Sequence, residues 1–220
     1  MARKRKVGNL MGLAVLSTLV VQPRHRYDIA AQMKAWGKDA DMGVKWGSLY
    51  TVVDNLAKHG FVEAVGSERD GARPERTIYR ITAAGRAELS DWTRELISNP
   101  EPEQRRFVAG LSVVSALPPD EVVELLTLRI TKLEKTIRDT RSELAALEGT
   151  LPRLFLIEED YLLAMLAAEA EWARGLRDSL ADGSFPDVEG WRRFHVDGFI
   201  PDHIIDMRDG GATDSQTPQD

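Results

Sequence analysis

Gly47-Ser48-Leu49-Tyr50, continuing to Gly60 and Phe61, is the stretch that decides the fold of this chain. Its apolar residues recur at helical spacing, which predicts a helix from about Gly47 to His59. Gly60 is suited to end this helix because glycine readily adopts the left-handed conformation found after helix ends. Phe61–Val65 then alternates in polarity, as a half-buried strand does. The stretch therefore predicts a helix that leads directly into a strand.

The residues on either side extend this pattern into a known arrangement. Upstream, apolar periodicity predicts helices over 9–21 and 27–36. Downstream, a basic turn at 69–74 is followed by a second alternating strand, Arg76–Ile81. Thr82 is a good N-cap for a further helix over 83–97. Three helices, a two-stranded wing and a closing helix predict a winged helix-turn-helix in residues 1–98.

A different organisation is expected after the proline-rich segment 99–102. A short helix over 107–117 precedes two long amphipathic helices that meet at a bend, 149–152. The first long helix carries a seam of apolar residues at spacings of four and three: Leu126, Ile130, Leu133, Ile137, Leu144 and Leu147. Such a seam predicts a helical hairpin or coiled coil over 103–182 that pairs with a second copy of the chain. Residues 183–220 are expected to be irregular, with a disordered end.

Charge divides the chain in the same way. Its net charge is −6, but residues 1–90 hold 15 Lys and Arg against 9 Asp and Glu, a net of +6. The remainder carries a net of −12. A basic module on an acidic chain is expected when only that module meets phosphate. The absence of cysteine excludes disulfides and thiolate metal sites, and the longest apolar run, 10–21, is too short to span a membrane, so a cytoplasmic location is expected.

Double-stranded DNA is the partner that this basic module predicts. A recognition helix needs small and hydroxyl-bearing residues at its N-terminal end and basic residues around it. The candidate DNA contacts are Lys45, Ser48, Tyr50, Thr51, Lys58, Arg69, Arg73 and Arg76. The basic run Arg3–Lys6 is a further candidate for phosphate contact. The alternatives are that Ser48 is only a helix cap, that Tyr50 belongs to the core, and that the wing arginines are merely solvated.

At these residues the chain resembles the PadR family of bacterial transcriptional regulators. The matching elements are Tyr27-Asp28-Ile29, Gly47–Tyr50, Gly60-Phe61-Val62 and Arg76–Thr82. The resemblance implies a homodimeric repressor, in some members an activator, that binds a palindromic operator and is released by a small molecule. It also implies DNA contacts by Ser48, Tyr50, Thr51 and the wing arginines. Arg26, where the family often has glycine, and Trp46, where it usually has proline or threonine, depart from the pattern.

The resemblance extends to a possible site for an aromatic or hydrophobic effector. Trp92 matches a position that stacks on flat aromatic drugs in small family members. Together with Met165 and Trp172 it is a candidate lining residue, although a packing role is the alternative for each.

Two other classes of protein stay open. The first is a winged-helix module that binds protein and not DNA. The second is a metal-dependent enzyme using His195 and His203 with nearby aspartates, Asp197, Asp202 and Asp206. The four histidines follow no metal-ligand spacing, and there is no nucleophile elbow or phosphate loop. We therefore expect no enzyme activity, no cofactor and no metal.

Overall fold

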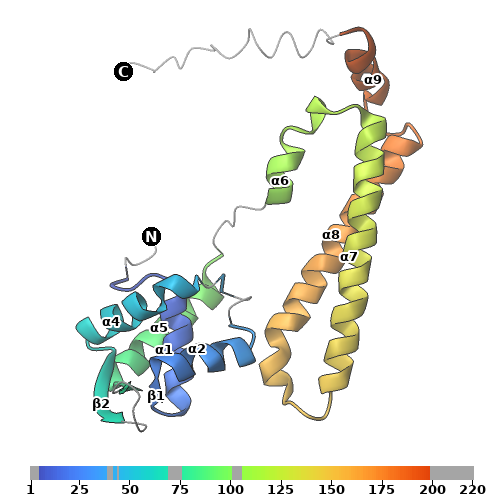
Figure 1. The fold of residues 1–220 in the computed structure, drawn as a ribbon. Coiled ribbons are helices and arrows are strands. Elements are labelled where there is room, and N and C mark those ends of the chain that lie inside the picture. Colours follow the sequence, from blue (N-terminus) through green and yellow to red (C-terminus); the bar gives the residue numbers. More distant parts are fainter. Residues whose placement is uncertain (1–4, 39–41, 44, 69–75, 101–105, 199–220) are drawn as a thin grey trace, which may run out of the picture. The chain divides into compact units, whose positions relative to one another are not determined.

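The computed structural model describes residues 5–38, 42–43, 45–68, 76–100 and 106–198. It divides into two compact units, Met1–Glu103 and Gln104–Asp220. Figure 1 gives the elements of each unit, and the two are described separately. No helix within the described residues is both long and apolar enough to cross a membrane.

Unit 1, as far as the structure describes it, combines helices with a small antiparallel sheet. The helices are α1 (Leu10–Val21), α2 (Arg26–Ala35), α4 (Leu49–Lys58) and α5 (Ala83–Ser98), and a 3₁₀ turn, η1 (Trp46–Ser48), precedes α4. The strands are β1 (Arg24–His25), β2 (Val62–Glu68) and β3 (Arg76–Ile81), in the spatial order β1-β3-β2. The predicted winged helix fold, mainly α-helical, is therefore confirmed.

The core of unit 1 is built around α1, which is buried along most of its length. Its apolar residues pack with Ile29 and Met33 of α2 and with the inner face of α4. Thr18 is the one buried polar side chain in α1, and its Oγ1 donates to the carbonyl of Ala14 at 2.9 Å. A helix that is apolar on every side is expected at the centre of a small domain, where neighbours cover all its faces.

The sheet has one strand more than the sequence predicts. Residues Arg24 and His25 form β1, which pairs with Tyr79 and Ile78 on the free edge of β3. A two-residue strand is too short to show alternation, so periodicity cannot reveal it. The consequence is that the start of α2, at Arg26, is held beside β3.

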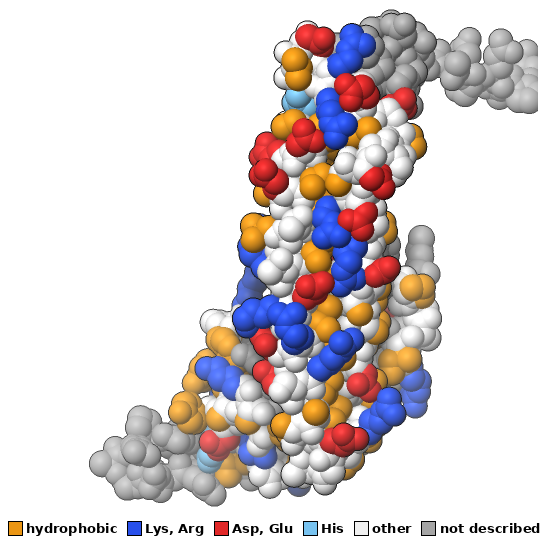
Figure 2. Space-filling view, turned by 90° about the vertical axis from the view of Figure 1, so that its right-hand side faces the viewer, with side chains coloured by type: hydrophobic (Ala, Val, Ile, Leu, Met, Phe, Trp, Pro, Cys, Tyr) orange, Lys and Arg blue, Asp and Glu red, His pale blue; other side chains and the backbone are white. Residues whose placement is uncertain are grey.

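Unit 2 is dominated by two long helices that lie side by side (Figure 1). These are α7 (Pro119–Leu147) and α8 (Ile157–Ala181), joined through η3 (Arg153–Leu156). Shorter elements precede and follow them: α6 (Arg106–Leu111), η2 (Val114–Ala116) and α9 (Val188–Asp197). Figure 2 shows charged side chains of both signs interspersed with hydrophobic ones on the visible face of the hairpin.

The prediction that residues 183–220 are irregular is wrong for Val188–Asp197, which form α9. This helix packs on unit 2 through buried Val188 and through Trp191, whose Nε1 donates to the carbonyl of Leu117 at 3.0 Å. Arg192 pairs with Asp120 at 3.1 Å. Half of its ten residues are charged or His, and Val188 is the only one that is buried, so few residues anchor the helix.

The predicted seam of six apolar residues, from Leu126 to Leu147, lies on α7 and is called the α7 seam from here on. It is largely occupied within the chain itself. Leu126 and Ile130 lie in one buried cluster with Ala173 and Leu180 of α8. Of the other seam residues, Ile137 is buried, Leu133 and Leu144 are half-buried, and Leu147 is exposed. The seam thus joins α7 to α8 of the same hairpin, and its role between two copies of the chain stays a prediction.

A second apolar stripe lies on α8 and is largely open. Ile157, Tyr161, Ala168 and Trp172 fall at helical spacing and are all exposed, Tyr161 at 61%. We call these four residues the α8 stripe. The opposite face of α8, with Ala170, Ala173 and Leu180, is the one that is buried. Helix α8 is therefore apolar on two faces, only one of which is covered in the single chain.

Candidate nucleic-acid interface

Helix α4 has one face in the core and one face in solvent. Leu49, Val52, Val53 and Leu56 are buried against α1 and α2. The exposed face carries the polar residues of the helix and one aromatic: Tyr50, Thr51, Asp54, Asn55 and Lys58. A helix fixed by its apolar side, with polar side chains outward, has the form needed to enter a DNA major groove.

Tyr50 lies at the N-terminal end of this exposed face and is 56% exposed. Its ring is held by the guanidinium of Arg26, whose Cζ lies 5.4 Å from the ring centroid. The alternative that Tyr50 belongs to the core does not match this exposure. Its hydroxyl is therefore available to an external acceptor.

Ser48 is the last residue of η1 and is half-buried. It makes no side-chain cap to α4, contrary to the cap alternative. Its Oγ donates to the carbonyl of Lys45 at 2.9 Å and lies 3.6 Å from the sulfur of Met11. To donate to a phosphate, Ser48 would have to exchange the bond to Lys45, while Thr51 is already exposed on the first turn of α4.

The basic candidates differ in how far the structure describes them. Lys45, just before η1, and Lys58, the last residue of α4, are both exposed. Arg76 begins β3 opposite Glu68 in the backbone register. Arg69 and Arg73 lie outside the described residues. The wing contacts therefore stay predictions.

Three further residues lie at this face and were not among the predicted DNA contacts. Asp54 and Asn55 share the exposed side of α4 with Tyr50 and Thr51, and Arg26 reaches it from the start of α2. The positions of Asp54 and Asn55 follow from helical spacing, four residues after Tyr50 and Thr51. No spacing in the sequence predicts that Arg26 reaches this face, because β1 holds the start of α2 beside β3.

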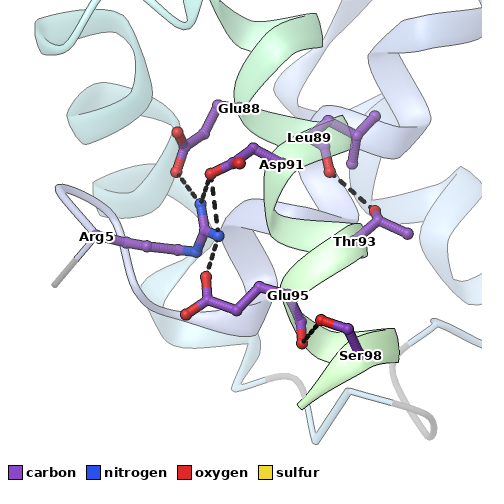
Figure 3. A network of polar contacts seen from close by, with 7 residues as sticks. All are labelled: Arg5, Glu88, Leu89, Asp91, Thr93, Glu95 and Ser98. Carbon is purple, nitrogen blue, oxygen red and sulfur yellow. Dashed lines mark hydrogen bonds and ion pairs between the residues drawn. The ribbon is translucent and has the colours of Figure 1, made fainter. Parts of the chain in front are cut away.

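Arg5 does not belong to a free basic arm. Figure 3 shows its guanidinium among three carboxylates of α5, those of Glu88, Asp91 and Glu95. Its nitrogen Nη1 lies 2.7 Å from Glu88 and 3.4 Å from Asp91, and its side chain is only 6% exposed. Burial lowers the pKa of Arg5, but hydrogen bonds to Glu88 and Glu95 outweigh burial and raise it above its ordinary value. Phosphate contact by Arg5 is thereby disfavoured.

The candidate effector residues fall in both units. Trp92 is buried in unit 1, with the guanidinium of Arg5 at 5.2 Å from its ring. Met165 is half-buried in α8, and Trp172 is exposed, with its ring edge-on to Phe107 at 5.9 Å. Since the three residues belong to separately described units, their convergence on one pocket stays a prediction.

The metal-site alternative finds no support among the described residues, which contain no group of three His, Cys, Asp or Glu placed to hold an ion. His195 lies in α9, and its Nε2 is 3.0 Å from the carbonyl of Ser115. Asp197, the last residue of α9, pairs with Arg193 at 3.9 Å, and Asp202, His203 and Asp206 lie outside the described residues.

The model of the transcriptional regulator PadR-like family matches residues 15–91. No protein with a curated description matches the sequence.

Solved structures share the fold at low sequence identity. Bacillus subtilis PadR in complex with operator DNA is 20% identical with a TM-score of 0.64, covering 78% of this chain and 99% of that one. The Vibrio cholerae virulence activator AphA is 19% identical with a TM-score of 0.56, covering 78% and 98%. The PadR-like regulator BC1756 from Bacillus cereus is 17% identical with a TM-score of 0.54, covering 79% and 99%. Residues 15–91 thus match the model of the transcriptional regulator PadR-like family, and the chain shares the fold of the solved PadR structures.

Proposed function

We propose that this protein is a DNA-binding transcriptional regulator, a homodimeric repressor that binds a palindromic operator and is released by a small effector. The observation that carries the proposal is the exposed face of α4, held on a winged helix by its buried apolar side. Bacillus subtilis PadR, which has this fold, has been solved in complex with operator DNA. A role in catalysis is not part of the proposal.

In this proposal α4 enters the major groove with Tyr50 and Thr51 toward base edges and phosphates. Lys45 and Lys58 lie at the two ends of η1 and α4, and both are exposed. They would meet phosphates on either side of the groove. Arg69, Arg73 and Arg76 of the wing would contact the adjacent backbone or minor groove.

The homodimer is supported by the open α8 stripe. A helix with two apolar faces needs two partners, and α7 supplies only one of them. A second copy of the hairpin can cover the other face and would bring two α4 helices to two half-sites. The α7 seam would then hold each hairpin together, so that the stripe is presented to the partner.

The effector is proposed to be a small aromatic or hydrophobic molecule. Bacillus subtilis PadR has also been solved in complex with p-coumaric acid. Aromatic and sulfur-containing residues suit such a ligand because they offer apolar, polarisable surface. Trp92, Met165 and Trp172 are the residues proposed to contact it.

The test is a selection of duplexes from a random-sequence library by the purified full-length chain. We expect an inverted-repeat sequence to be enriched and its affinity to fall steeply as salt rises, since bound Lys and Arg release counterions. Tyr50→Ala should weaken binding by at least about tenfold. Tyr27→Ala, which removes another exposed tyrosine of unit 1, is the matched control and should bind as wild type does. Addition of p-coumaric acid tests release of the bound duplex by one effector of the proposed class.

Failure to enrich any duplex at low salt would contradict the regulator proposal. That outcome would favour the alternative of a protein-binding winged helix. Equal losses for Tyr50→Ala and Tyr27→Ala would contradict the assignment of α4 as the reading helix.

A further inference from the structure

Arg26 connects three elements of unit 1 through one guanidinium group. It is the first residue of α2, and its Nη2 donates to the hydroxyl of Tyr79 in β3 at 2.6 Å. The same nitrogen forms an ion pair with Asp54 of α4. Its Cζ also lies over two tyrosine rings, 5.0 Å from that of Tyr79 and 5.4 Å from that of Tyr50. Arg26 thus contacts the recognition helix at two residues.

Folding stability explains only part of this arrangement. Asp54 is 61% exposed, and ion pairs with an exposed partner contribute little to stability. The Nε of Arg26 is buried and has no acceptor among the described residues, which is a cost. The contacts with buried Tyr79 serve the fold, whereas the ion pair with exposed Asp54 contributes little to it and points to a role at the exposed face of α4.

The charge of Asp54 makes such a role necessary. Asp54 is the only acidic residue in α4, and it is exposed on the face that carries Tyr50 and Thr51. A free carboxylate on that face would repel the phosphates of an approaching duplex. The guanidinium of Arg26 supplies the opposite charge at hydrogen-bonding distance, while its flat surface lies against the ring of Tyr50.

We infer that Arg26 is a positioning residue for DNA recognition, which neutralises Asp54 and fixes the ring of Tyr50 on the reading face of α4. The inference rests on the proposed function and adds a residue to it. Arg26 acts through Asp54 and Tyr50, because its hydrogen bonds are directed to groups of the protein. Its effect should therefore depend on whether Asp54 carries a charge.

The test measures affinity for the duplex that the wild-type full-length chain selects from a random-sequence library, over a range of salt. Arg26→Ala should weaken binding by about tenfold or more. Asp54→Asn alone should bind at least as tightly as wild type, because it removes the repulsive charge. In Arg26→Ala/Asp54→Asn most of the affinity lost in the single variant should return, since no carboxylate is left to neutralise.

A second ion pair in the same unit provides the matched control. Arg80 pairs with Glu63 across β2 and β3 at 2.7 Å, and both side chains are about half exposed. Arg80→Ala removes the same positive charge from unit 1 and should change affinity by less than about threefold. Thermal unfolding midpoints of all variants separate a loss of DNA binding from a loss of folding.

Three outcomes would overturn the inference. Equal affinity of wild type and Arg26→Ala would show that Arg26 has no role in recognition. Equal affinities of Arg26→Ala and the double variant would show that Asp54 is not the group it acts on. Tighter DNA binding by Arg26→Ala than by wild type would show that Arg26 opposes recognition. In each case wild type still binds DNA and the proposed function stands, whereas a wild-type chain that selects no duplex overturns both.

Discussion

At the scale of the residue, close packing at position 85 admits only glycine, because there is no room for a side chain. Thr82 caps α5 by accepting from the amide of Gly85 at 3.0 Å, as its position in the sequence predicts. The same turn brings Gly85 against the chain at Phe61. A Cβ on Gly85 would lie 2.0 Å from the carbonyl oxygen of Phe61. Helix α5 can therefore meet the start of β2 only where it has no side chain.

Gly85→Ala should destabilise unit 1 strongly, because the contact is with backbone, which cannot rotate away. We expect a loss of at least about 3 kcal/mol, which lowers the thermal midpoint of unit 1 by more than about 10 °C. The control is Gly8→Ala, since a Cβ there meets nothing within 4 Å. Calorimetry of both variants checks the prediction. A midpoint for Gly85→Ala that matches the Gly8→Ala value would contradict the packing argument.

At the scale of the element, what sequence predicts depends on periodicity. Helices α1, α2, α4 and α5 and strand β3 were predictable, because each exposes one face and buries another or is apolar throughout. Strand β2 was predicted from its alternating residue types, although Val62 is the only buried residue among its described side chains. Strand β1 and helix α9 were not, because two residues carry no period and α9 is held by a few anchors. The same reason explains the candidate site. The exposed position of Asp54 follows from the helical period of α4. Its ion-pair partner Arg26 begins α2, and the place of that residue depends on β1, which periodicity does not reveal.

Helix α5 depends on Arg5 for its electrostatics. Glu88, Asp91 and Glu95 recur at spacings of three and four, so their carboxylates share one side of the helix. Arg5→Ala leaves these like charges together without their buried partner and should cost about 2–4 kcal/mol. Because salt screens the remaining repulsion, the difference from wild type should shrink as salt rises from about 0.05 to 1 M. Thermal unfolding at both salt concentrations measures this.

Lys6→Ala is the control for Arg5→Ala, because Lys6 is exposed next to it. It removes the same charge and should leave the midpoint almost unchanged. A loss for Arg5→Ala that is the same at low and high salt would instead indicate that packing against Trp92 accounts for the effect.

At the scale of the whole molecule, the division of charge corresponds to the division into two units. Unit 1 holds 16 Lys and Arg against 13 Asp and Glu, whereas unit 2 holds 13 against 22, so the acidic residues are concentrated in unit 2. Helix α4 of unit 1 is the part proposed to meet phosphate. The acidic remainder holds α7 and α8. Sequence periodicity identified both long helices, but it did not determine which apolar face α7 gives to α8. A spacing of three and four is the same for a partner within the chain and for one outside it.

The α8 stripe and the α7 seam therefore predict different results for the two kinds of substitution. Tyr161→Glu places a charge on the open stripe, where Tyr161 is 61% exposed, and should dissociate the proposed homodimer without unfolding the hairpin. Ile130→Asp places a carboxylate in the cluster between α7 and α8 and should unfold unit 2, at a cost of at least about 3 kcal/mol. Sedimentation of each variant, with circular dichroism for helix content, separates the two effects. A Tyr161→Glu chain that keeps the dimer mass would exclude the stripe as the interface. A well-folded Ile130→Asp monomer would instead assign the dimer interface to the α7 seam.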